Sequence, residues 1–186
     1  MYAAEFDYVR ASSIEEAISL KGANDDSSLL AGGHSLIPAM KLRLSTPKKL
    51  IDISGLDQLK NISNNGNYIS IGALCTHKQC AESDIIQSNC PALSDAAAVI
   101  GDPHVRNKGT LGGALAHSDP QADYPGVVLA LDATIVAQGS DGERTIAASD
   151  YFTGLWETAL GEGELLTEIR IPVNSMNANS CYVKFP

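Results

Sequence analysis

The chain has 186 residues, of which 44% are hydrophobic and 19% are charged, a composition typical of a folded globular protein rather than a disordered one. Its length allows one domain of ordinary size or two small lobes that share a core. The formal net charge is −9 and only 5% of the residues are aromatic, which argues against non-specific binding to nucleic acid or to an anionic membrane.

The sequence contains no export signal, membrane span or metal motif. The N-terminal segment lacks a basic region and an apolar core, and the longest apolar run, residues 127–131, is too short to cross a bilayer. We therefore expect a cytoplasmic protein without a transmembrane segment. The cysteines form no CxxC pair and the histidines lack metal-ligand spacing, so we expect no metal site on this chain.

Residues 1–55 have the pattern of a small α/β lobe. Ser12 and Ser13 each precede a glutamate by three residues, and this capping-box spacing predicts a helix over residues 12–22. Short strands are expected at residues 28–31 and 49–53. The alternation of strand and helix is typical of a βαβ unit.

Residues 56–172 predict a second, larger lobe of mixed, mainly antiparallel α+β structure. Alternating apolar residues indicate strands at residues 68–72 and 165–171. The run Gly139-Ser140-Asp141-Gly142 between two further apolar segments is a hairpin signal. Helices are expected from Thr76 to Ile86 and from Pro91 to Ile100, while residues 127–131 fit either a helix or a strand.

The last part of the chain, residues 173–186, has a different character. Residues 173–180 are polar and resemble a linker, whereas residues 182–185 resemble the first strand of a further domain. An independent domain rarely ends inside a strand pattern. We therefore expect the chain to be a fragment or a C-terminally truncated product.

Two glycine-rich segments are candidate binding loops: LAGGHSLIP at residues 30–38 and GTLGGALAHSDP at residues 109–120. Each places a Gly-Gly pair near a hydroxyl residue, Ser35 or Thr110. Glycine lets backbone N–H groups converge and lets an anion approach without meeting a Cβ. Neither segment contains Lys or Arg, so binding would rest on backbone dipoles.

More familiar motifs are absent from the sequence. It has no GxxxxGK[ST], no GxGxxG followed by an acidic residue, and no GxSxG. A plain tight turn is the alternative interpretation of either glycine segment. Two such segments in one chain favour a cradle for a pyrophosphate.

Four segments occur in a specific order and spacing: AGGHSLIPAMKLRL (31–44), LIDIS (50–54), GTLGGALAHSDPQADYP (109–125) and YVKFP (182–186). Together they resemble the FAD-binding (medium) subunits of the molybdenum hydroxylases, the family of xanthine dehydrogenase and aerobic carbon monoxide dehydrogenase. The resemblance implies an α+β, two-lobed FAD-binding fold of the vanillyl-alcohol-oxidase (PCMH) type. A smaller C-terminal domain would follow, of which residues 173–186 would be the linker and the start.

The resemblance also implies a set of FAD-binding residues in the two glycine segments. The first would wrap the pyrophosphate: Ala31, Gly32, Gly33, His34, Ser35, Leu36 and Ile37. Of these, Gly32, Gly33, His34 and Ser35 would give backbone donors. The second would close on the same pyrophosphate: Thr110, Gly112, Gly113 and Ala114. Family members often have Asn where this chain has Ala114, so Ala114 would be a backbone contact at most. Valine at Gly32 or Gly112 would then abolish FAD binding while the fold survives.

Four further residues receive roles from the same resemblance. Asp123 would accept hydrogen bonds from ribityl and ribose hydroxyls. Ile100 and Leu166 would pack against the isoalloxazine ring, and Lys184 would lie near its polar edge. The alternatives are a turn cap for Asp123, strand core for Leu166 and a solvated surface position for Lys184. His34 and His117 are interpreted as loop residues that position the backbone, so no catalytic residue is expected on this chain.

The implied function is that of an oxidoreductase subunit that transfers electrons. A small partner subunit would carry two [2Fe–2S] clusters and a large one the molybdenum cofactor, usually as a dimer of heterotrimers. A basic group is a candidate contact for an acidic partner: Lys41, Arg43, Lys48 and Lys49. Two alternatives stay open, a stand-alone FAD-dependent oxidoreductase of the same fold and a flavin-free interaction remnant.

Overall fold

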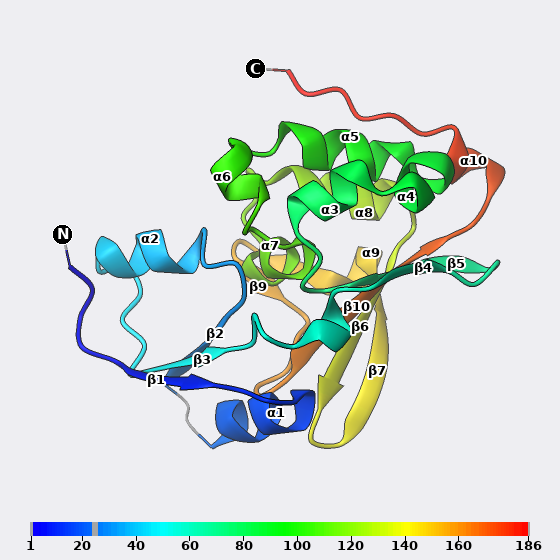
Figure 1. The fold of residues 1–186 in the computed structure, drawn as a ribbon. Helices are drawn as coiled ribbons and strands as arrows, with labels where there is room; N and C mark the ends of the chain where they lie inside the picture. Colours follow the sequence, from blue (N-terminus) through cyan, green and yellow to red (C-terminus); the bar gives the residue numbers. More distant parts are fainter. Residues whose placement is uncertain (1, 24–25, 186) are drawn as a thin grey trace.

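The computed structural model describes residues 2–23 and 26–185, which form a smaller, three-stranded sheet, a larger, five-stranded sheet, a short two-stranded sheet and a layer of helices (Figure 1). The smaller sheet has three parallel strands in the order β1-β3-β2: Asp7–Arg10 (β1), Ser27–Leu30 (β2) and Lys49–Asp52 (β3). Helix α1 (Ile14–Gly22) joins β1 to β2. The predicted α/β character of this part is confirmed; the division of the chain at residue 55 stays a prediction.

Helix α1 begins two residues later than predicted. Ser13, not Ser12, is the N-cap residue, and its hydroxyl oxygen accepts from the N–H of Glu16 at 3.1 Å. The N–H of Ser12 donates to the Glu16 carboxylate at 2.7 Å. Both serines therefore act with one glutamate at a single helix start, as capping chemistry favours.

The larger sheet is antiparallel and has the strand order β4-β5-β10-β6-β7. Its strands are Ile62–Asn64 (β4), Tyr68–Gly72 (β5), Thr134–Gly139 (β6), Gly142–Ala147 (β7) and Leu165–Pro172 (β10). The predicted hairpin is confirmed, because Gly139 pairs with Gly142 across a two-residue turn. The central strand β10 is buried along most of its length, which explains its apolar alternation.

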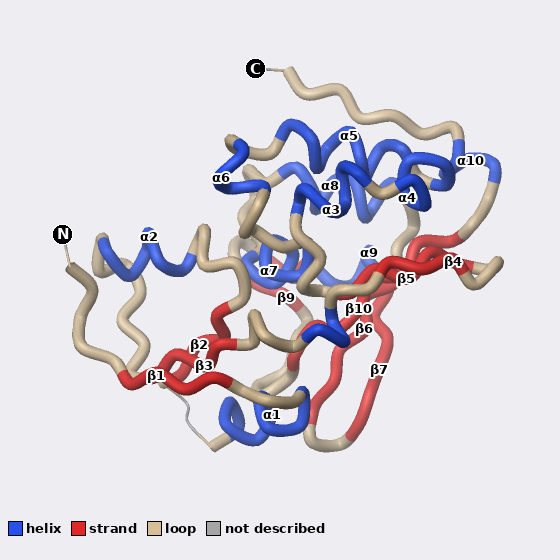
Figure 2. The backbone as a smooth tube through the Cα atoms, in the orientation of Figure 1, coloured by secondary structure: helices blue, strands red, loops and turns tan. Residues whose placement is uncertain are grey.

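Helices gather on one side of this sheet (Figure 2). They are His77–Glu82 (α3), Asp84–Asn89 (α4), Pro91–Val99 (α5), Pro103–Arg106 (α6), Leu111–His117 (α7) and Asp123–Ala130 (α8). The larger core lies between the helices and the sheet, with Ile71, Leu93, Leu115, Val128 and Ile169 among its buried residues. The ambiguous residues 127–131 are thus mainly helical, in α8.

Short elements complete the chain: Leu36–Lys41 (α2), Asp57–Leu59 (η1), Ala148–Tyr151 (α9), Phe152–Gly154 (β8), Glu157–Thr158 (β9) and Ser175–Ala178 (α10). None of the described helices is long and apolar enough to cross a membrane.

The single helix predicted from Thr76 to Ile86 is wrong. The backbone leaves the helical region at Ser83, where ψ is 115°, and the Ser83 hydroxyl caps α4 by accepting from the N–H of Ile86 at 3.4 Å. Serine competes for backbone bonds at such positions, so it ends one helix and begins the next.

The predicted linker and final strand are also different in the structure. Asn177 of α10 is buried, and its amide donates to the carbonyls of Leu131 and Pro172 at 3.1 and 2.9 Å. Residues 182–185 form no strand; instead the N–H of Tyr182 donates to the Asp95 carboxylate of α5 at 3.2 Å. The start of the segment is therefore held by backbone carbonyls, and Tyr182 near its end is held by a side chain of the helical layer. Pro186 lies outside the described residues.

Candidate functional site

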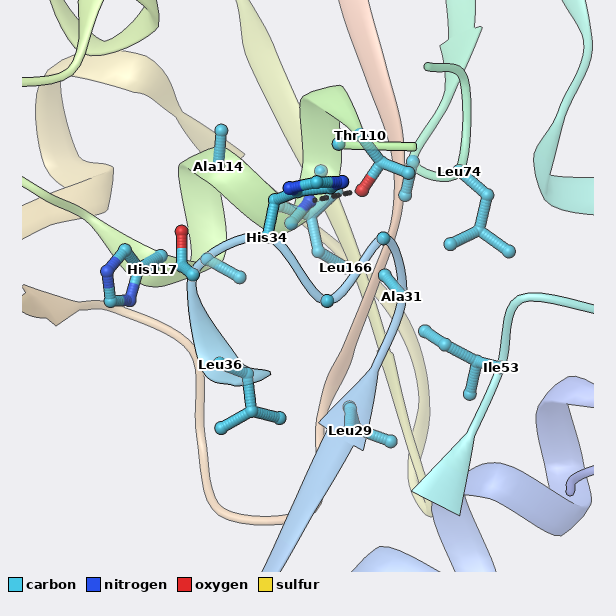
Figure 3. A pocket seen from close by; sticks show the side chains of 18 of the residues that line it. Leu29, Ala31, His34, Leu36, Ile53, Leu74, Thr110, Ala114, His117 and Leu166 are labelled. Carbon is cyan, nitrogen blue, oxygen red and sulfur yellow. Dashed lines mark hydrogen bonds between the residues drawn. The ribbon is translucent and has the colours of Figure 1, made fainter. Parts of the chain in front are cut away.

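A cavity of about 580 Å³ lies where the smaller sheet, the helical layer and β10 meet (Figure 3). Its volume falls in the usual range of ligand pockets. Of the residues predicted to bind FAD, all but Ile37 and Lys184 line this cavity: Ala31, Gly32, Gly33, His34, Ser35, Leu36, Ile100, Thr110, Gly112, Gly113, Ala114, Asp123 and Leu166. The tertiary structure thus brings together segments more than 130 residues apart.

The first glycine segment follows β2 and lies directly against the backbone of residues 108–109. A Cβ added at Gly32 would sit 2.1 Å from the carbonyl oxygen of Lys108. Gly33 has φ +74°, a conformation that L side chains rarely adopt. Both glycines are therefore required by the backbone path itself, and together they leave this edge of the cavity without side-chain bulk.

The same segment carries unused hydrogen-bond donors. Within the described parts of the chain, the N–H groups of residues 32–35 donate to no acceptor, and the first N–H used is that of Ile37, which donates to the Gly33 carbonyl at 3.0 Å. Ser35 precedes α2 and its hydroxyl makes no cap bond. These backbone donors, which lie on the half-buried Gly32 and Gly33 and the exposed His34 and Ser35, are thus available to a ligand.

The second glycine segment is not the loop that we expected. Thr110 is the N-cap of α7, and its hydroxyl oxygen accepts from the N–H of Gly113 at 3.1 Å (Figure 3). The N–H groups of Leu111 and Gly112 donate to the carbonyls of Cys75 and Ala73, both at 2.9 Å. The expected backbone donors are therefore already bonded, and this segment forms a wall of the cavity.

Glycine at 112 serves packing rather than anion access. Its added Cβ would lie 2.5 Å from the Cβ of Ala73. The expectation that valine at Gly32 or Gly112 leaves the fold intact is therefore wrong. At each site the added side chain would overlap with other protein atoms, whether or not a ligand is bound.

Asp123, the first residue of α8, accepts two hydrogen bonds from the C-terminal segment. Tyr182 Oη lies 2.5 Å from Oδ1 and Lys184 Nζ lies 2.9 Å from Oδ2. The first of these bonds raises the pKa of the Tyr182 hydroxyl. Asp123 makes no turn cap, since the N-cap of α8 is Ala122. A carboxylate has about four acceptor sites, so it keeps capacity for a ligand hydroxyl.

The other predicted residues divide by position. Leu166 is buried in the larger core and Ile100 packs against that core, and both also reach the cavity. Lys184 is exposed and does not line the cavity, but its ammonium group forms an ion pair with Asp123, which does. Ile37 is 39% exposed on α2. His34 and His117 are exposed lining residues, and the His117 ring meets Trp156 edge-on at 4.8 Å.

Sequence reasoning missed two further features of the wall. Glu164 lines the cavity and is held by Arg144, whose Nε and Nη2 donate to its carboxylate at 2.6 and 2.7 Å. His77 lines it too, paired with Tyr124. Both pairs join residues at least 20 positions apart, so no local spacing in the sequence predicts them.

This chain matches a protein family and is similar to several known proteins. Residues 4–174 match the family described as the FAD binding domain in molybdopterin dehydrogenase. The glyceraldehyde dehydrogenase medium chain of Sulfolobus acidocaldarius is 43% identical over 93% of this chain and 62% of its own length. The carbon monoxide dehydrogenase medium chain of Hydrogenophaga pseudoflava is 41% identical over 96% of this chain and 63% of its own.

A solved structure gives the same picture. A chain of carbon monoxide dehydrogenase from Hydrogenophaga pseudoflava, in a form that lacks the Mo-pyranopterin moiety of the molybdenum cofactor, superposes with a TM-score of 0.92 at 42% identity. The match covers 94% of this chain and 61% of that chain. The chain therefore spans about three fifths of the length of the relatives it resembles, and the predicted fold is confirmed.

Proposed function

Because this chain belongs to the family of FAD binding domains in molybdopterin dehydrogenases, we propose that its cavity holds FAD and that it acts as the electron-transfer subunit of a molybdenum-containing hydroxylase or dehydrogenase. The observation that carries the proposal is the run of unpaired backbone N–H groups at residues 32–35, on the wall of the cavity. Such a run suits a pyrophosphate, since backbone dipoles need no lysine or arginine to hold an anion.

The remaining walls fit the other parts of FAD. Ile100 and Leu166 offer apolar surface for a ring, and Asp123 offers a carboxylate for hydroxyl groups. When bound, FAD supplies one- and two-electron transfer, which is chemistry of the cofactor itself. The chain's own residues would bind and orient the cofactor and exclude water from it.

We infer the partner subunits from the relatives of this chain. These are described as medium chains, a term for one subunit among several. We infer that this protein likewise works with an iron–sulfur subunit and a subunit that carries the molybdenum cofactor, as a dimer of heterotrimers in the cytoplasm. The basic group at Lys41, Arg43, Lys48 and Lys49 stays a predicted contact for such a partner.

The first experiment is the visible absorption spectrum of the purified protein, followed by denaturation and identification of the released chromophore. Released FAD, with turnover that requires the partner subunits, supports the proposal. Turnover by the chain alone would favour a stand-alone oxidoreductase. A full-length protein that is colourless and takes up no added FAD would favour the flavin-free alternative.

Replacing Ala114 by asparagine is expected to tighten FAD binding about 3- to 10-fold. Ala114 is half-buried on the cavity wall, and an amide there adds one donor worth about 0.5–1.5 kcal/mol. Titration of the apoprotein with FAD, followed by flavin fluorescence, measures the effect. Serine at the same position is a smaller donor and should fall between the two; equal affinity in all three proteins would contradict the prediction.

Replacing Asp123 by asparagine is expected to weaken FAD binding about 10-fold or more, because a charged acceptor for ligand hydroxyls is lost. It should also raise hydrogen exchange in residues 182–185, since Lys184 loses its ion pair. Asp95→Asn is the matched control: Asp95 binds the same segment through the Tyr182 N–H but does not line the cavity. If both variants kept wild-type affinity, Asp123 would serve only as a tether.

A further inference from the structure

We propose that His77 is a direct ligand-binding residue, whose neutral imidazole donates a hydrogen bond from Nε2 to a phosphate oxygen of the bound dinucleotide. This inference rests on the proposed function and adds a residue to it that the sequence did not suggest. The position of the His77 ring, its partner at Nδ1 and its access to the cavity support this role.

The backbone around His77 is held firmly. His77 is the first residue of α3, whose N-terminus carries a full capping box between Thr76 and Gln79. Its own N–H donates to the carbonyl of Gly109 at 2.9 Å, and Thr76 forms a β-bridge with Thr110. The residue is thus fixed beside the second glycine segment, at the point where that segment enters the cavity wall.

The imidazole has one nitrogen engaged. Nδ1 lies 3.0 Å from the hydroxyl of Tyr124, and the two rings lie 5.3 Å apart. Tyr124 is fully buried, so its hydroxyl would be costly to leave without this hydrogen-bond partner. If the phenol donates to Nδ1, the proton of the neutral imidazole resides on Nε2, because only one ring nitrogen then carries hydrogen.

The second nitrogen, Nε2, has no partner among the described residues, although His77 is only 4% exposed. Nε2 is nevertheless not fully buried, because Tyr151 Oη is the only fully buried side-chain oxygen or nitrogen without a partner in the described chain. His77 lines the cavity, and the neighbour of Nε2 is Gly109, where a Cβ would fall 2.5 Å from that atom. Glycine there leaves the nitrogen uncovered.

The surroundings keep the ring neutral and favour an anion as its ligand. Burial lowers the pKa of His77 to about 4, and the nearby His34 and Arg106 add to this effect. Both neighbours are basic, and His34 belongs to the segment with the unpaired N–H groups. A phosphate held by that segment would meet Nε2 as a further donor, without the desolvation cost of a buried positive charge.

The test compares FAD affinity among single variants. His77→Phe removes both ring nitrogens and should weaken FAD binding about 10- to 100-fold, the range for a hydrogen bond to a charged group. His77→Gln restores a donor at a similar distance from the backbone and should recover most of that loss. His104→Phe is the control, since His104 is exposed on α6 and outside the cavity. Wild-type affinity in His77→Phe would overturn the inference.

A second measurement does not depend on a variant that folds. Nitrogen-15 NMR of the wild-type histidine side chains should show His77 protonated at Nε2, with a resonance that moves when FAD is added. A proton on Nδ1, or an Nε2 signal unmoved by saturating FAD, would overturn the inference. Absence of FAD binding by the wild-type protein would instead contradict the proposed function, so the two failures are distinguishable.

Discussion

Replacing Gly32 by alanine is expected to abolish FAD binding and to lower the free energy of unfolding by about 1–3 kcal/mol or more, the usual cost of overpacking. The added Cβ would lie 2.1 Å from the Lys108 carbonyl oxygen and 2.8 Å from the Cα of Gly109. Both atoms belong to the backbone, so no side-chain rotation relieves the overlap. The first glycine segment must then move away from α7, and its unpaired N–H groups move with it.

Gly126→Ala is the matched control for this change. Gly126 lies in α8, where nothing stands within 4 Å of an added Cβ. Alanine in a helix is favoured over glycine by up to about 1 kcal/mol, so this variant should be unchanged or slightly more stable. Urea denaturation and FAD titration of both variants check the prediction. A Gly32→Ala protein as stable as the wild type would mean that the two segments do not touch as described.

The acid sensitivity of the protein is expected to depend on His77. At pH 4.5 the wild type should have lost about 2 kcal/mol more unfolding free energy, relative to pH 7, than the His77→Gln variant. Burial, with His34 and Arg106 nearby, lowers the pKa of His77 to about 4 from its usual value of 6.5. Each pKa unit corresponds to about 1.4 kcal/mol.

The direction follows from proton binding. Above pH 6.5 the imidazole is neutral in both the folded and unfolded chains and contributes nothing to the pH dependence. As the pH falls from about 6.5 to about 4, the unfolded chain binds a proton that the folded chain does not, so unfolding is favoured. The loss is complete near pH 4.

Urea denaturation at pH 7 and pH 4.5, followed by circular dichroism, measures the difference. Carboxylates that titrate in this range are common to both proteins and cancel in the comparison. His104→Gln serves as the exposed control and should follow the wild type. Parallel curves for the wild type and His77→Gln would show that His77 is not buried as a neutral group.

Much of the secondary structure followed from local signals in the sequence. The hairpin turn at residues 139–142, the apolar alternation of β10 and the proline at the start of α5 each act within a few residues, so pattern alone located them. Where a polar side chain had two possible local bonds, as at Ser83, pattern was insufficient, and one predicted helix became two.

The sequence by itself also indicated which two segments lie along the cavity, because glycine pairs and their spacing mark places where a backbone must come close to another group. Only the tertiary structure decided what each segment contributes. The donors at residues 32–35 are unused, whereas those of Leu111, Gly112 and Gly113 are bonded to Cys75, Ala73 and Thr110. Likewise, His77 meets Tyr124 across 47 positions. A hydrogen bond between distant residues depends on how the chain folds back on itself, and no local pattern records it.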